Sequence, residues 1–130
     1  MRTSLTCRCL ALAAATGAEA QTLKGHWSGL VEQTGPGAVK DRYVATLTLD
    51  GATGAMDYPT LLCGGDVSFV SRAGDTSVYR EHITRGPCID AGTISVRPSK
   101  GGVLWTWTAE GVIANGRFYK VVEAATSHRP

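Results

Sequence analysis

Apolar and polar side chains alternate along most of the chain after residue 21, in short runs separated by Gly, Asp, Pro or Asn. In residues 42–49, Tyr43, Ala45, Leu47 and Leu49 occupy every second position. A period of two is typical of a β-strand with one buried face, whereas an amphipathic helix has a period of 3.6 residues. The pattern predicts strands at residues 26–33, 42–49, 56–58, 66–72, 76–84, 93–97, 103–108 and 112–122.

The connections between these runs are short and rich in turn-forming residues. Residues 73–75 (Ala-Gly-Asp) and 99–102 (Ser-Lys-Gly-Gly) are typical of hairpin turns. An open sheet of about eight strands would leave two unpaired edges and one apolar face in water, and closure into a barrel removes both problems. We therefore expect an all-β protein, an antiparallel up-and-down barrel of about eight strands. A two-sheet β-sandwich is the alternative.

The first 20 residues have the layout of a secretory signal peptide. A short start with one arginine precedes the mostly apolar residues 5–15, and residues 18–20 (Ala-Glu-Ala) form a small-x-small cleavage site. Arg8 interrupts the apolar stretch. A short amphipathic cytosolic helix is therefore one alternative, and a lipoprotein anchor at Cys7 is another, although the residues before Cys7 match an anchor poorly.

Cleavage after residue 20 leaves one domain, which we place at residues 21–125, and a flexible tail at residues 126–130. The formal net charge is +2, without the clear basic excess of a general nucleic-acid binder. No apolar run reaches the roughly 18 residues that cross a bilayer, so we expect no membrane span in the mature chain. An exposed strand at residues 52–58 offers pairing with a second copy, but Pro59 shortens that edge. We expect an exported, periplasmic or secreted monomer.

Cleavage also reduces the four cysteines to Cys63 and Cys88. Two cysteines in an exported chain most simply form one disulfide. The bridge would close a loop of about 26 residues, worth roughly 3.5 kcal/mol in the chain-entropy model. A metal site or a reactive thiol is the alternative, but neither cysteine has a Cys-x-x-Cys partner or a nearby histidine.

Two sequence blocks contain these cysteines, at residues 57–65 (DYPTLLCGG) and 79–94 (YREHITRGPCIDAGTI). With residues 27–29 (WSG) and 104–107 (LWTW), they resemble a group of small exported bacterial β-domains. Some members of the group stand alone, and others lie on the extracellular side of bacterial serine/threonine kinases. The resemblance implies export, one disulfide, a β-fold and, more weakly, a sensing or binding role. It supplies no ligand or catalytic residue, and these 130 residues contain neither a kinase domain nor a membrane span.

A weaker similarity, carried by Gly25-His26-Trp27 and Arg117, is to the calycin barrels: lipocalins, avidins and small periplasmic protease inhibitors. These proteins have a Gly-x-Trp on the first strand and a basic residue near the last. The similarity implies that Trp27 plugs one end of the barrel and that the Arg117 guanidinium stacks on the indole ring. It also implies a calycin-like closed barrel.

Glu81 lies between two apolar residues on the face of its strand that is expected to point into the core. The adjacent His82 points to the opposite face, so the two cannot form an acid–base pair without a partner from elsewhere. A buried carboxylate needs a partner, and Arg117 or Arg97 is expected to supply it. Glu81 is then either part of a structural ion pair, or exposed at an edge, or a polar anchor inside a ligand cavity.

Trp105 and Trp107 share one face of the predicted strand at residues 103–108. If that face points inward, the two rings are core residues or walls of a ligand cavity. If it points outward, Leu104 packs inside and the rings form an exposed platform for a sugar or a protein.

No combination of residues in the sequence points to catalysis or to a cofactor. The three histidines, at positions 26, 82 and 128, lack metal-ligand spacing. No Gly-x-Ser-x-Gly elbow or phosphate-binding loop is present. We expect a non-enzymatic module that binds or senses an unknown small molecule or exported protein. The alternative is a periplasmic inhibitor or immunity protein acting on a protease or a cell-wall hydrolase, with the segment at residues 21–24 inserting into its target.

Overall fold

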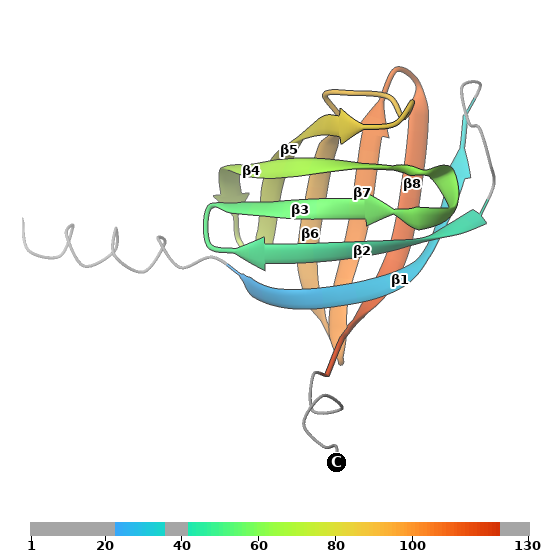
Figure 1. The fold of residues 1–130 in the computed structure, drawn as a ribbon. Coiled ribbons are helices and arrows are strands. Elements are labelled where there is room, and N and C mark those ends of the chain that lie inside the picture. The colour runs from blue at the N-terminus through green and yellow to red at the C-terminus, as the bar shows by residue number, and fades with distance from the viewer. Residues whose placement is uncertain (1–22, 36–41, 123–130) are drawn as a thin grey trace, which may run out of the picture.

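The computed structural model describes residues 23–35 and 42–122 of the chain. Eight antiparallel strands close into one barrel in sequence order (Figure 1). The predicted barrel is confirmed, and the two-sheet sandwich is wrong because β8 pairs with β1 along eight residues. The strands are β1 (Lys24–Thr34), β2 (Arg42–Asp50), β3 (Thr53–Tyr58), β4 (Cys63–Ala73), β5 (Thr76–Arg85), β6 (Thr93–Ser99), β7 (Gly102–Ala109) and β8 (Val112–Lys120).

The predicted signal peptide at residues 1–20 and the predicted tail at residues 126–130 lie outside the described residues. Within the described residues, no helix is long and apolar enough to cross a membrane. A single turn of 3-10 helix, η2 (Pro59–Leu61), connects β3 to β4.

Two strands begin three residues earlier than the sequence pattern indicated. β3 starts at Thr53 rather than residue 56, and β4 starts at Cys63 rather than residue 66. Glycine is the reason in both cases. Gly54 in β3 lies against the Thr48 carbonyl and Gly65 in β4 against the His82 carbonyl, where a Cβ would not fit. Gly64, which also looks like a loop residue, lies under the Arg85 guanidinium. β3 is also no edge strand, because it pairs with β2 on one side and β4 on the other.

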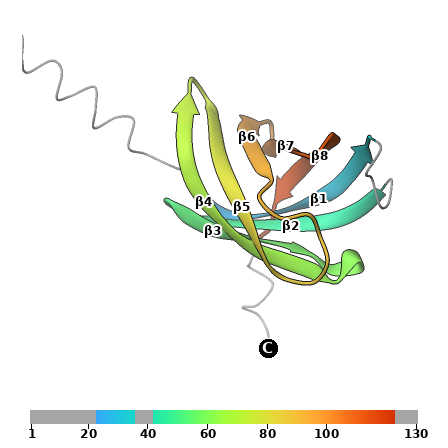
Figure 2. The ribbon, with the colours of Figure 1, turned by 90° about the horizontal axis from the view of Figure 1, so that it is seen from above.

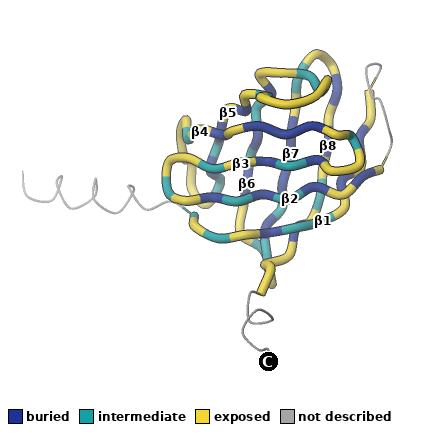
Figure 3. Tube along the Cα trace, in the orientation of Figure 1, coloured by how far each residue is buried: buried dark blue, intermediate teal, exposed yellow. Residues whose placement is uncertain are grey.

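The barrel interior is filled with apolar side chains. Buried positions alternate with more exposed ones along β2, β6 and β7. Figure 3 shows the alternation by colour along β2. Trp105 stacks on Phe118 in the core, with 5.1 Å between ring centroids. Leu47 and Ile94 are also fully buried and belong to the same core. The inward faces therefore follow the alternation that the sequence predicts.

The two ends of the barrel differ. Trp27 lies near the start of β1, and the Nζ of Lys120 lies 5.2 Å from its ring centroid. At the other end lie η2 and the loop at residues 86–92, and a disulfide joins Cys88 of this loop to Cys63, the first residue of β4. Figure 2 shows this loop after β5 reaching the turn after β3. We call this the capped end, with residues 59–62 and 86–92 as its cap.

Candidate functional site

A small cavity lies inside the barrel at the capped end. Its volume is about 40 Å³, and it is lined by Gln33, Tyr43, Tyr58, Leu61, Glu81, Cys88, Ile89 and Trp107. These residues come from five strands and both cap segments. Leu61, Cys88 and Ile89 are partly exposed and form the outer rim, whereas the other five lining residues are buried.

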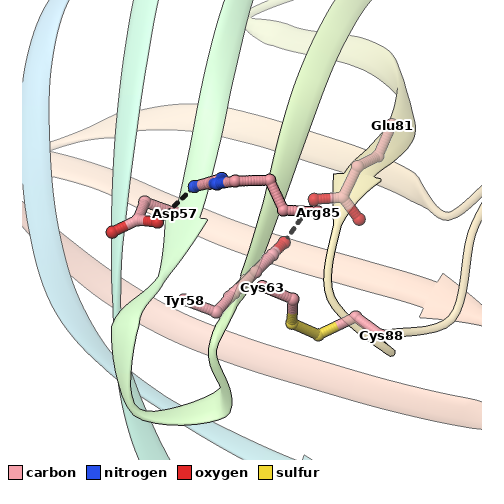
Figure 4. A network of polar contacts seen from close by, with 6 residues as sticks. All are labelled: Asp57, Tyr58, Cys63, Glu81, Arg85 and Cys88. Atoms are coloured by element: carbon pink, nitrogen blue, oxygen red, sulfur yellow. Dashed lines mark hydrogen bonds and ion pairs between the residues drawn. A yellow bond between two sulfur atoms is a disulfide. The ribbon is translucent and has the colours of Figure 1, made fainter.

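Glu81 is the charged group of this cavity, and its side chain is almost completely buried, with 1% exposed. The hydroxyl of Tyr58 donates a hydrogen bond to its Oε2 at 2.6 Å. The indole Nε1 of Trp107 donates to its Oε1 at 2.8 Å. Figure 4 shows Tyr58 and Glu81 reaching toward each other across the barrel interior. Three strands, β3, β5 and β7, therefore converge on one carboxylate.

The protein environment moves the proton affinity of this cluster upward. Burial raises the pKa of Glu81 above its usual 4.5, while the bonds from Tyr58 and Trp107 oppose that rise and the Asp90 carboxylate adds to it. Burial and the nearby Glu81 raise the pKa of Tyr58 well above 10. The same two causes raise the pKa of Tyr43 to about 12. Both tyrosines therefore remain protonated at neutral pH.

The expectation that Arg97 or Arg117 pairs with Glu81 is wrong. Neither Arg97 nor Arg117 reaches it, because both lie at exposed positions on the outer face of the barrel. Arg117 instead donates from Nη1 to the hydroxyl of Ser99 at 2.7 Å. Phe118, the next residue, is fully buried, and the alternation along a strand forces Arg117 outward.

The cation expected over Trp27 is also a different residue. Lys120, at a distance of 5.2 Å from the ring centroid, occupies the place predicted for Arg117. Trp27 pairs with Lys120 across β1 and β8, whereas Arg117 pairs with Leu30. Trp27 is buried near one end of the barrel, as a plug would be.

Trp105 and Trp107 both point inward, so the exposed platform is wrong. Trp105 belongs to the packed core through its stacking on Phe118. Trp107 is a wall of the cavity at the capped end and holds Glu81 by its indole nitrogen. Of these two residues on one face of β7, Trp105 therefore packs in the core and Trp107 belongs to the candidate site.

The loop of the cap is tied to the barrel at three points. The disulfide joins Cys88 to Cys63 at the start of β4. The Ile83 N–H donates to the Asp90 carboxylate at 2.7 Å. The Glu81 N–H donates to the Gly92 carbonyl at 2.9 Å. A Cβ on Gly92 would overlap the Trp107 indole, so this glycine lets the loop pass close to the cavity wall.

An ion pair on the outer face braces the same end. The Arg85 Nη2 donates to the Asp57 Oδ1 at 2.6 Å, joining β5 to β3 across β4 (Figure 4). The residue between them in the ladder is Gly64, which pairs with both. Because Gly64 has no side chain, the Arg85 guanidinium can cross over the strand.

Sequence reasoning identified Glu81 and Trp107 but missed Gln33, Tyr43 and Tyr58 as cavity residues. The alternation along β2 placed Tyr43 in the barrel interior, although not beside Glu81. The contacts themselves join residues 23 and 26 positions apart in the chain, from strands that are not neighbours. Periodicity carries no information on such contacts across a barrel.

The lining of the cavity holds a single carboxylate, no Ser, His, Lys or Arg, and a cysteine that is in the disulfide. Among residues 23–35 and 42–122, no group of three His, Cys, Asp or Glu lies close enough to hold a metal ion. No family model, curated protein or solved structure matches this chain. What the site does must therefore be inferred from its own geometry.

The stability of the folded protein should depend on pH through Glu81. The folded state raises the pKa of Glu81, so it holds this proton more tightly than the unfolded chain does. The contribution of Glu81 to stability is then largest below its ordinary pKa near 4.5 and falls as pH rises toward the raised folded value. Glu81→Gln should remove this fall, which urea unfolding measured from pH 4 to 8 would show as a flatter profile.

Glu110→Gln is the matched control, because Glu110 lies exposed in the turn between β7 and β8. Its pH profile should follow that of the wild type. The slopes are compared rather than the absolute stabilities, since the glutamine amide places an N–H donor where the ionised carboxylate has an acceptor. Parallel profiles for the wild type and Glu81→Gln would contradict the raised pKa.

Proposed function

We propose that this protein is a non-catalytic, exported bacterial module for binding or sensing, and that its recognition site is the cavity at the capped end. The observation that carries the proposal is the carboxylate of Glu81, buried in a cavity whose lining contains no cation. A buried charge without a counter-ion is costly for a fold, and a buried carboxylate that lines a cavity is a candidate for a functional group. A ligand that interacts with Glu81 offsets this cost.

The chemistry of the lining favours binding over catalysis. Both oxygens of Glu81 accept hydrogen bonds, from Tyr58 and Trp107. Hydrolysis by paired carboxylates needs a second carboxylate, and a nucleophilic mechanism needs a hydroxyl or thiol activated by a base. The eight lining residues contain one carboxylate, no serine or histidine, and a cysteine that is in the disulfide.

The cavity size limits what can enter. One buried water molecule needs a cavity of about 10–15 Å³. The cavity of about 40 Å³ therefore accommodates a group of a few heavy atoms. A carrier of drug-sized molecules would have a cavity of roughly 300–1,000 Å³. The site therefore suits a very small ligand or the tip of a larger one.

One observation favours the alternative, an inhibitor or immunity protein that binds an exported protease or cell-wall hydrolase. Leu62, in the cap, is 80% exposed and has a positive φ of 59°. A leucine rarely adopts this backbone conformation, and its exposed side chain beside the cavity rim suits contact with a protein. Residues 21 and 22 of the expected inserting segment lie outside the described residues.

Native mass spectrometry of the protein, recovered from its own exported fraction without denaturation, tests the proposal. The polypeptide mass should correspond to residues 21–130 less two hydrogens for the disulfide. A small bound mass that leaves on gentle heating, and that is missing from Glu81→Gln, is the expected result. A stoichiometric protein partner would instead establish the alternative, and a bare chain in both samples would contradict any tightly bound ligand or partner.

A further inference from the structure

We propose that the cavity at the capped end binds a small alkylammonium group, with Glu81 as its counter-ion. The inference rests on the proposed function and names the chemical class of its ligand. The group is either a free amine of a few heavy atoms or the end of a longer amine chain, such as a lysine side chain of a partner protein.

The lining of the cavity has hydrogen-bond acceptors that lack a donor. Gln33 is 6% exposed, and its Oε1 is buried with no hydrogen-bond partner among the described residues. The carboxylate oxygens of Glu81 have lone pairs beyond the two that Tyr58 and Trp107 use. The lining thus has spare acceptors on two sides, and leaving them unpaired is costly. An occupant that satisfies them must donate hydrogen bonds.

The charges around the cavity also favour a cation. Facing Glu81 are the neutral hydroxyls of Tyr43 and Tyr58 and the indole of Trp107, and beyond the cavity the carboxylate of Asp90. At this end of the barrel, Arg85 is paired with Asp57 on the outer face, and the imidazole Nδ1 of His82 lies 3.4 Å from the Asp90 carboxylate. The cavity therefore presents a net negative charge. A cation is attracted to it, and an anion of the same size is repelled.

The aromatic wall of the cavity is a third feature that favours a cation. Tyr43 and Tyr58 meet edge to face at 6.0 Å between ring centroids, and both line the cavity together with Trp107. Aromatic faces attract cations, and alkylated ammonium groups above all, because their methyl groups pack on the rings while the charge meets the ring quadrupole. Three rings and a carboxylate form a site for a cation with an apolar surface rather than for a hydrated metal ion.

The rim of the cavity favours an amine that carries an alkyl chain. Leu61 and Ile89 are partly exposed and apolar, and they lie between the cavity and solvent. A methylene chain leaving the cavity would pack against them, while the ammonium group stays with Glu81. The cavity of about 40 Å³ excludes a whole polyamine or amino acid from the interior. Only the end of such a molecule fits.

The test is a titration of the ¹⁵N-labelled protein at pH 7, followed by the NMR signal of the Trp107 indole N–H. Methylammonium chloride and n-butylammonium chloride should shift this signal and saturate. Sodium chloride at equal ionic strength and sodium acetate should not. Lowering the pH should weaken amine binding, because Glu81 then takes up a proton, while the amine with a pKa near 10 stays charged.

Glu81→Gln keeps the shape of the side chain and removes its charge, and it should weaken amine binding about tenfold or more, as expected when a charged hydrogen bond becomes neutral. Glu110→Gln, on the exposed turn, should bind like the wild type. If Glu81→Gln fails to fold, Gln33→Met serves instead. It removes an acceptor that has no partner among the described residues, so it should fold and bind the amine several-fold more weakly.

Two further ligands separate the possible sources of the amine. N-acetyl-lysine methylamide binding tighter than methylammonium would indicate a lysine side chain of a partner protein, and its Nε-acetylated form should then not bind. Methylammonium binding without the lysine derivative would indicate a free small amine. Binding of acetate, unchanged affinity in Glu81→Gln, or no binding of either amine would overturn the inference. If native mass spectrometry shows another bound species at the same time, the proposed function survives this failure.

Discussion

Trp105→Ala is expected to lower the free energy of unfolding by about 3–5 kcal/mol, the usual cost of emptying a buried tryptophan site. The residue is 1% exposed, and its ring stacks on Phe118 inside the barrel. Neighbouring strands are fixed by their ladders on both sides, so the core cannot collapse around the vacated space. Thermal unfolding should show a fall in Tm of roughly 15 °C or more for a domain of this size.

Leu104→Ala is the matched control, because Leu104 is the preceding residue of β7 and lies on the opposite face of the sheet. Leu104 is partly buried, so its replacement should cost about 1–2 kcal/mol, still well below the loss at Trp105. Trp105→Phe should fall between the two, since the buried indole Nε1 of Trp105 has no partner among the described residues. Losing an unpaired donor offsets part of the lost volume. Equal losses for Trp105→Ala and Leu104→Ala would contradict the inward face of β7.

Removing the disulfide is expected to cost about 3.5 kcal/mol. Cys63 and Cys88 are separated by 25 residues, and the bridge restricts that loop in the unfolded chain. A domain of this length has a free energy of unfolding of about 5–15 kcal/mol, so the loss is a large fraction of the total. Urea unfolding of the Cys63→Ser/Cys88→Ser double variant would measure it.

The oxidised wild type treated with a reductant is the direct comparison and should unfold at the same urea concentration as the double variant. The cap should loosen as well, because one of its three ties to the barrel is lost. Amide hydrogen exchange of residues 86–92 should therefore rise more than that of β7. An unfolding midpoint that reduction leaves unchanged would contradict the expected stabilisation.

The strand pattern could be predicted from the sequence because burial in a barrel repeats every second residue. Tyr43, Leu47 and Trp105 each follow that rule. The boundaries at Gly64 and Gly65 could not be predicted, since glycine usually interrupts a strand. Here it is needed at two close approaches, one under the Arg85 guanidinium and one against the His82 carbonyl.

The contacts of the candidate site were less predictable. Alternation placed Glu81 in the interior, but its partners depend on the tilt and stagger of the strands, which decide which inward side chains meet across the barrel. An arginine was expected beside Glu81 because a charge commonly pairs with a charge. Tyr58 and Trp107 stabilise it with neutral donors instead.

The order of the strands also determines how this chain folds. Seven of the eight ladders join strands that are consecutive in the sequence, so each can form as a local hairpin or through a short loop. The ladder between β1 and β8 joins opposite ends of the domain, pairing Trp27 with Lys120. Such a long-range contact has the highest loop-closure entropy and is slow to form. The native barrel therefore depends on the last strand, and a chain lacking β8 retains two open edges and a core exposed to solvent.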